Sequence, residues 1–129
     1  MLVTNDDSCL LGRHSSWQKG LYAVIAGFVE PGESIESAVK REVEEETGIR
    51  VTNIKYHSSQ PWPFPCSLMI AFTATAENVD IDNDEDELDD VRWFSRDELK
   101  KKLAANQITI ASKVSMAYTL LSEWMEQTD

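Results

Sequence analysis

The segment that most constrains this chain is rich in glutamate and has helix signals at both ends. Residues 34–47 begin with Ser34, a good N-cap, and stop before Gly48, which suits the left-handed residue that ends many helices. On a helical wheel with about 100° between residues, the apolar side chains form a single stripe. They are Ile35, Ala38, Val39 and Val43. The segment therefore predicts a helix with one face packed on a sheet.

Three glutamates of this helix lie where charge is unfavourable. Glu42 and Glu46 fall inside the apolar stripe and Glu45 falls at its edge, and their spacing makes them repel one another. Carboxylates in such a place either take up protons or bind cations, and oxygen ligands suit Mg²⁺ or Mn²⁺. The alternative is a solvated acidic face, which conflicts with the position of the apolar stripe. Arg41 is expected to pair with Glu45 or with a loop carboxylate.

The rest of the chain predicts alternating strands and helices. Short apolar or β-branched runs bounded by turn residues indicate strands at 1–4, 9–11, 22–25, 54–57, 68–76 and 91–94. A capping box of Ser95 and Glu98 predicts a helix that ends near Ala104. A last helix is expected at about 112–126, with one apolar stripe made of Val114, Ala117, Tyr118, Leu121, Trp124 and Met125. This order indicates one domain, 1–129, with an α/β/α sandwich around a mixed sheet.

The charge balance limits the partners. The net charge is −11, which gives no general electrostatic case for binding nucleic acid or anionic lipid. The same field repels a phosphate-bearing small molecule, so an enzyme acting on phosphates would need cations at its site. No apolar run approaches the roughly 20 residues of a membrane span. We therefore expect no membrane partner.

The cysteines and the chain start bear on location. Cys9 and Cys66 form no CxxC pair, so we expect free thiols in a reducing compartment and no zinc site. The first residues lack the pattern of a secretory signal. We predict an intracellular protein, in the cytoplasm or alternatively in an organelle.

A longer pattern around the helix resembles a known signature. Five residues separate Gly27 from Glu33, and seven more separate Glu33 from the run Arg41-Glu42-Val43-Glu44-Glu45-Glu46-Thr47-Gly48-Ile49. This spacing resembles the Nudix box with every fixed position filled. The resemblance implies a strand–loop–helix unit and hydrolysis of a nucleoside diphosphate linked to another group.

The resemblance also implies roles for the helix residues. Glu42, Glu45 and Glu46 would coordinate two or three Mg²⁺ or Mn²⁺ ions, which neutralise charge on the diphosphate and activate a water molecule. The catalytic candidates are Glu45, Glu46 and Arg41. Either Glu46 or Glu45 could take the proton of the attacking water, and this choice stays open.

A second signature indicates the substrate. Residues 59–69 read SQPWPFPCSLM, and prolines alternating with aromatics predict a stiff loop or, alternatively, a polyproline surface segment. The run resembles the SQPWPFPxS array of NADH pyrophosphatases in the Nudix family. This implies NADH or NAD⁺ as substrate, nicotinamide mononucleotide and AMP as products, and Gln60, Trp62 and Ser67 as pocket residues.

Three more residues are site candidates by the same resemblance. Phe28 would be a stacking platform for a base, or alternatively a core residue. Ala117, in the run Ser115-Met116-Ala117, would lie near the bound nucleotide. Glu87, in the run Glu87 to Phe94, would be a further metal ligand, although the acidic stretch 80–90 also fits a solvated loop between strands.

Other functions stay open at this stage. The same chemistry could act on NAD-capped RNA, on ADP-ribose or on a dinucleoside polyphosphate, and a catalytically silent Nudix fold could serve only for binding. The subfamily's upstream domain and four-cysteine zinc ribbon are absent from 1–129, so we expect a fragment or an unusually short version. By resemblance we also expect a homodimer.

Overall fold

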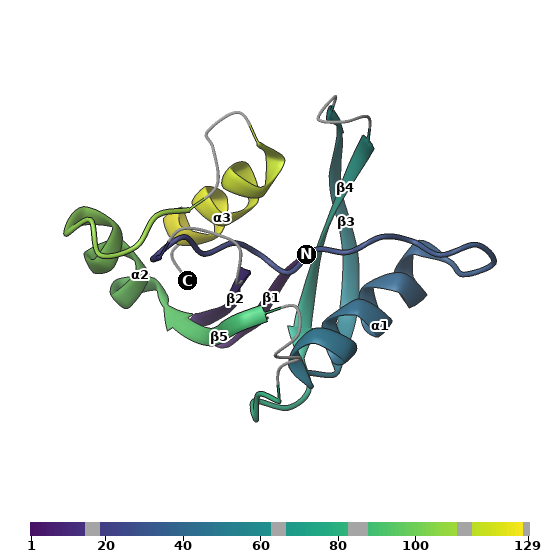
Figure 1. Ribbon diagram of the computed structural model, residues 1–129, viewed down its shortest axis with the longest axis horizontal. Helices are drawn as coiled ribbons and strands as arrows, with labels where there is room; N and C mark the ends of the chain where they lie inside the picture. The colour runs from purple at the N-terminus through teal and green to yellow at the C-terminus, as the bar shows by residue number, and fades with distance from the viewer. Residues whose placement is uncertain (15–18, 63–66, 83–87, 111–114, 128–129) are drawn as a thin grey trace.

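The computed structural model describes residues 1–14, 19–62, 67–82, 88–110 and 115–127. Its elements in chain order are β1 (Leu2–Asn5), β2 (Ser8–His14), α1 (Ile35–Thr47), β3 (Val51–Trp62), β4 (Ser67–Ala76), β5 (Leu88–Ser95), α2 (Arg96–Ala104) and α3 (Met116–Glu126) (Figure 1).

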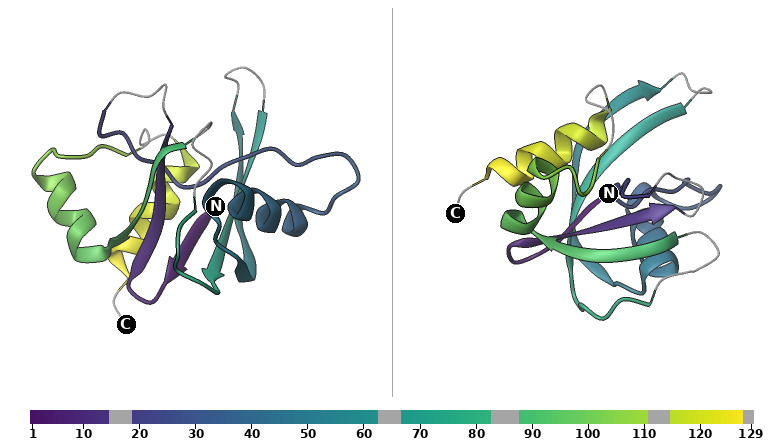
Figure 2. Two further views of the ribbon diagram at one scale, coloured as in Figure 1. Left: turned by 60° about the horizontal axis from the view of Figure 1, so that its bottom comes forward. Right: turned by 60° about the vertical axis from the view of Figure 1, so that its left-hand side comes forward.

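A mixed sheet forms the centre of the fold. Its five strands lie in the order β3-β4-β1-β2-β5, with β1 parallel to β4 and the other pairs antiparallel. The two faces carry different cores because side chains alternate along a strand. Leu2 of β1 packs in one core with Leu120 and Trp124 of α3, whereas Val3 packs in the other with Val39 of α1. Helices therefore cover both faces, and the predicted α/β/α arrangement is confirmed (Figure 1 and Figure 2).

The predicted ends of α1 and α2 are confirmed by their caps. The Ser34 hydroxyl accepts a hydrogen bond from the Ser37 amide at 3.1 Å, and Gly48 has φ +74° at the end of α1. The Ser95 hydroxyl accepts from the Glu98 amide at 3.1 Å at the start of α2. These local contacts satisfy backbone groups that a helix end leaves without partners.

Helix α3 differs in part from its prediction. It begins at Met116 behind the N-cap Ser115, and residues 111–114 lie outside the described part of the chain. Its buried stripe consists of Met116, Leu120, Leu121 and Trp124. Of the predicted stripe, Leu121 and Trp124 are buried, and Val114 lies outside the described residues. The other three, Ala117, Tyr118 and Met125, are only partly buried.

The predicted strand at 22–25 is wrong. This segment makes only two isolated bridges, Gly12 with Ala23 and Leu21 with Thr109. Tyr22 packs in the α3-side core and Ile25 in the α1-side core. The apolar side chains of 22–25 pack alternately into the two cores, so the segment has the sequence pattern of a strand although it lacks continuous backbone pairing.

Two predicted loops are partly strand. Residues 59–62 end β3 and 67–69 begin β4, and Trp62 pairs with Ser67 across this hairpin. Pro61 is tolerated there because β3 is an edge strand and needs no further backbone donor. Residues 88–90 of the predicted acidic loop belong to β5.

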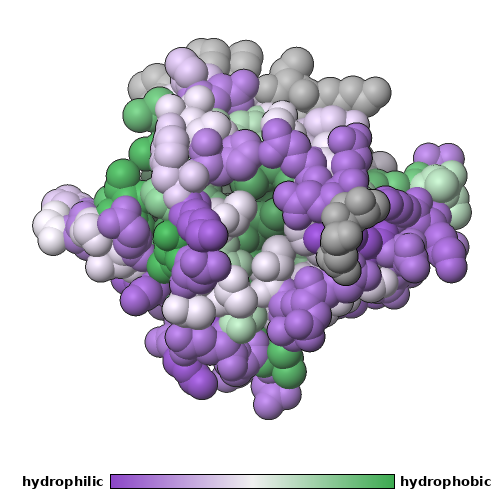
Figure 3. All heavy atoms as spheres, turned by 180° about the vertical axis from the view of Figure 1, so that it is seen from behind, coloured by the Kyte–Doolittle hydropathy of each residue, from purple (hydrophilic) through white to green (hydrophobic). Residues whose placement is uncertain are grey.

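Outward-facing surfaces are mainly polar. Hydrophilic residues cover most of the face seen from behind, and hydrophobic ones show near its centre and in smaller groups along its edges (Figure 3). None of the described helices is long and apolar enough to cross a bilayer.

Candidate functional site

The glutamates of α1 differ sharply in exposure. Glu46 is 8% exposed and the Glu42 side chain 16%, whereas the Glu45 side chain is 62% exposed. The prediction that carboxylates turn toward the protein body is confirmed for Glu42 and Glu46. It is wrong for Glu45, which lies at the edge of the apolar stripe and points to solvent.

Arg41 connects these carboxylates to the preceding loop. Its guanidinium donates to both oxygens of Glu33, from Nη2 at 2.6 Å and from Nε at 3.0 Å. Its Nη1 donates to Glu42 at 2.8 Å and to Glu45 at 3.2 Å, and its Nη2 also donates to the Phe28 carbonyl at 3.0 Å. Both expected partners of Arg41, Glu45 and a loop carboxylate, are therefore present. The fork geometry of arginine suits such a shared contact.

This network changes the acid–base properties of its members. Hydrogen bonds from Arg41, and then one from the Glu30 backbone, lower the pKa of Glu33 from 4.5 to about 2. The hydrogen bonds to Glu33 and then Glu42 raise the pKa of Arg41. The loop that carries Phe28 is thus held to α1 by a permanently charged pair at neutral pH.

Replacing Arg41 by Lys should raise the pKa of Glu33 toward 4.5, because an ammonium group cannot contact both carboxylate oxygens as a fork does. The wild-type pair stabilises the fold above about pH 4.5, and this contribution is lost as the pH falls toward 2. The measurement is a carbon-13 titration of the Glu33 carboxyl in both proteins. An unchanged midpoint would contradict the Arg41 assignment.

Gly27 makes room for Glu42. A Cβ atom built on Gly27 would lie 2.3 Å from both Cδ and Oε2 of Glu42, far inside van der Waals contact. Gly27 does not have positive φ, so its glycine identity reflects space and not backbone conformation. The Glu42 carboxylate therefore lies directly on the loop backbone, and any larger residue at 27 would displace it.

The candidates for substrate binding form two groups. Phe28 is 82% exposed, so its alternative role in the core is wrong, and Arg41 holds its backbone beside the α1 carboxylates. Gln60 lies near the tip of the β3–β4 hairpin, where Trp62 pairs with Ser67. The Gln60 Oε1 accepts from the Met116 amide at 2.9 Å, which brings the hairpin to the first turn of α3 and so to Ala117.

The described residues test the metal site only in part. Within them, no three or more His, Cys, Asp or Glu side chains converge closely enough to hold an ion. Glu87 lies outside the described residues, as does Cys66. Cys9 is a buried free thiol in the core, where burial raises its pKa to about 12.

The donor set nevertheless fits a divalent cation. Glu42 and Glu46 are one helical turn apart, both are mostly withdrawn from water, and Gly27 leaves a bare backbone beside Glu42. Carboxylate oxygens are hard ligands of the kind that Mg²⁺ and Mn²⁺ prefer. Two carboxylates of like charge withdrawn into one helix face favour a further cation beside Arg41, which already contacts Glu42.

Sequence reasoning missed two features of the site. The packing of Gly27 on Glu42 has no signal in a single sequence beyond the presence of the glycine. The contact of Gln60 with Met116 joins residues 56 positions apart, so a local sequence pattern could not predict it.

Comparisons with known proteins agree with this geometry. The profile of the NUDIX domain matches residues 1–114. With its mixed sheet, its glycine loop and its glutamate helix, the chain belongs to the Nudix family. The predicted place among the NADH pyrophosphatase branch is confirmed by the relatives at 40–50% identity.

Three relatives illustrate that branch. The chain is 47% identical over 124 residues to Nudix hydrolase 19, chloroplastic, of Arabidopsis thaliana. It is 41% identical over 120 residues to the NAD-capped RNA hydrolase NUDT12 of Homo sapiens, and 47% over 121 to the NAD-capped RNA hydrolase NudC of Photobacterium profundum. These matches cover 91, 91 and 94% of this chain but only 28, 26 and 42% of the relatives.

Solved structures confirm the fold. A NUDIX hydrolase from Nitrosomonas europaea superposes with a TM-score of 0.76 at 24% identity, over 97% of this chain and 69% of that one. The NUDIX domain of Shewanella oneidensis NrtR, solved with ADP ribose, gives 0.70 at 21% identity, over 95% and 79%. At this identity the likeness concerns the fold alone.

Proposed function

We propose that this chain is the catalytic domain of a metal-dependent hydrolase that cuts the diphosphate of NADH or NAD⁺ into nicotinamide mononucleotide and AMP. The observation that carries the proposal is the withdrawal of Glu42 and Glu46 to 16% and 8% exposure on the sheet-facing side of α1. The choice of substrate rests on the run SQPWPFPCS at 59–67, which resembles the array of NADH pyrophosphatases, and the names of the NUDT12 and NudC relatives contain the same NAD group.

The glutamates would hold the cations. We assign Glu42, Glu45 and Glu46 of α1, with Glu87, which directly precedes β5 in the sequence, to two or three Mg²⁺ or Mn²⁺ ions. Such ions neutralise charge on a diphosphate and lower the pKa of bound water. Arg41 holds the carboxylates of Glu42 and Glu45 in place through Nη1. The proton of the attacking water passes to Glu46 or Glu45.

The second group of residues would select the substrate. The exposed Phe28 ring offers a face on which a base can stack. Gln60, Trp62 and Ser67 shape the pocket at the β3–β4 hairpin, and the backbone at Ala117 borders it from α3. A dinucleotide lying between these groups would place its diphosphate at α1.

NAD-capped RNA is the second candidate substrate, because the NUDT12 and NudC relatives carry that name. The net charge of −11 disfavours long RNA contacts, but only the cap has to enter the pocket. ADP-ribose ranks below both. We further propose a homodimer inside the cell, in the cytoplasm or in an organelle such as the one named for the plant relative.

Product analysis tests the proposal directly. The protein is incubated with NADH and Mn²⁺ or Mg²⁺, and a parallel sample contains a chelator. We expect equal amounts of AMP and reduced nicotinamide mononucleotide, and none with the chelator. Cleavage at another bond, or equal rates with the chelator, would refute the assignment. Turnover of free NADH against an NAD-capped oligonucleotide at equal concentration then ranks the two substrates.

A further inference from the structure

Two hydrogen bonds between described residues of strand β3 and helix α3 involve side chains. Gln60 Oε1 accepts from the Met116 amide at 2.9 Å, and His57 Nε2 lies 2.7 Å from Glu123 Oε2. The three-residue step on β3 spans about 10 Å and the seven-residue step on α3 about 10.5 Å, at the usual rise of each element. The matching spans show that α3 runs antiparallel along β3, with one contact near each end.

The Gln60 contact supplies a hydrogen-bond acceptor for a backbone amide at the start of α3. The first amides of a helix have no partner within it. In α3 the Met116 amide donates to Gln60, and the Ala117 amide donates to the Ser115 hydroxyl at 3.2 Å. Gln60 thus acts as a cap supplied by another element, and it sets where the first turn of α3 lies relative to the β3–β4 hairpin.

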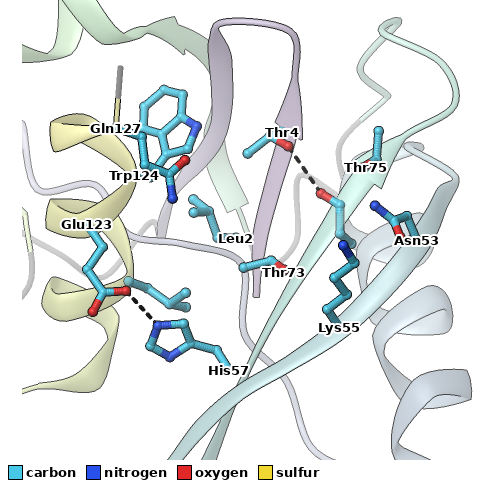
Figure 4. A pocket seen from close by; sticks show the side chains of 12 residues that line it. Leu2, Thr4, Asn53, Lys55, His57, Thr73, Thr75, Glu123, Trp124 and Gln127 are labelled. Atoms are coloured by element: carbon cyan, nitrogen blue, oxygen red, sulfur yellow. Dashed lines mark hydrogen bonds and ion pairs between the residues drawn. The ribbon is translucent and has the colours of Figure 1, made fainter. Parts of the chain in front are cut away.

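At the other end, packing and a contact from α2 hold α3, because Leu120, Leu121 and Trp124 are buried and Arg96 Nε donates to the Trp124 carbonyl at 2.9 Å. A pocket of about 230 Å³ opens beside this end, between α3 and the sheet. Lys55, Thr73 and Thr75 line it from the sheet, and Glu123 of α3 and the C-cap Gln127 line it from the other side (Figure 4). The C-terminal half of α3 is therefore held without Gln60, and the Gln60 contact bears on the first turn of the helix.

We propose that Gln60 is a positioning residue for the dinucleotide site. Its side-chain oxygen acts on α3 and not on the substrate, and it holds the backbone of Met116 and Ala117 beside Trp62 and Ser67. This rests on the proposed function, because the first turn of α3 borders the pocket only if that pocket takes the dinucleotide. It also gives Gln60 a different role from that of a residue that binds the substrate itself.

Two substitutions of Gln60 test the proposal. Gln60→Ala removes the acceptor, and we expect both the exchange rate of the Met116 amide and the KM for NADH to rise about tenfold, with kcat nearly unchanged. Gln60→Glu keeps an acceptor oxygen at a helix N-terminus, where negative charge is favourable, so both quantities should stay within about threefold of wild type. A direct substrate contact would give the opposite order, because a carboxylate cannot donate and repels a diphosphate.

His57→Ala is the matched control because it removes the other of these two hydrogen bonds, which lies away from Trp62 and Ser67. We expect Met116 exchange and KM to stay within about twofold of wild type. The proposal is overturned if Gln60→Glu raises KM as much as Gln60→Ala does, or if His57→Ala raises KM by the same factor. It is also overturned if Gln60→Ala leaves the exchange rate of the Met116 amide unchanged.

The two proposals can fail separately. If the wild-type protein neither binds nor hydrolyses NADH, the proposed function fails and with it the role of Gln60 in a dinucleotide site. Amide exchange, which needs no substrate, still shows in that case whether Gln60 holds α3.

Discussion

Replacing Glu46 by Gln should lower kcat for NADH hydrolysis by about 10²–10⁴-fold, because the variant loses a charged oxygen ligand and a candidate base at once. The fold should persist, since Gln has nearly the same shape as Glu and fills the same buried space at position 46. The measurement is kcat at saturating Mn²⁺ together with thermal unfolding and Mn²⁺ uptake.

Glu44→Gln is the matched control for this variant. Glu44 is one of four glutamates in the same run, but it is exposed on the solvent side of α1. Its loss should leave kcat within about twofold. If the Glu46→Gln protein keeps the wild-type kcat, then the glutamates of α1 do not hold the catalytic cations. A protein that binds NADH equally in both variants and turns it over in neither would instead be a binding module.

Replacing Gly27 by Ala should lower kcat/KM by about 10–100-fold and weaken Mn²⁺ binding by a similar factor, as loss of a supporting contact around a metal ligand does. The new Cβ would lie 2.3 Å from Glu42 Oε2, so the carboxylate has to move. That movement also breaks its 2.8 Å hydrogen bond from Arg41. The measurements are steady-state kinetics and calorimetric titration with Mn²⁺.

Gly32→Ala separates loss of space from loss of conformational freedom. Gly32 has φ +85° and nothing within 4 Å of a built Cβ. Its replacement should strain the loop and destabilise the fold by about 1 kcal/mol, with Mn²⁺ affinity close to wild type. If Gly27→Ala behaves like Gly32→Ala, with lower stability but normal Mn²⁺ affinity, then the space that Gly27 leaves for the Glu42 carboxylate is not needed for metal binding.

Local signals account for the parts of the fold that could be predicted. The capping serines, the αL glycine and the apolar stripe of α1 all act within a few residues of one another, so the printed sequence contains them. The same holds for the burial of Glu42 and Glu46, which follows from their angle on the helix. The spacing of the box then predicted the Nudix fold, and the structure confirms it.

By itself, then, the sequence determined the helix, its acidic inner face and the family. Tertiary structure alone decided that Glu45 points to water, that 22–25 serves two cores without being a strand, and that Gln60 caps α3. These features depend on which distant segments meet. Periodicity records only neighbours along the chain, whereas such contacts arise when folding brings together residues as far apart as 56 positions.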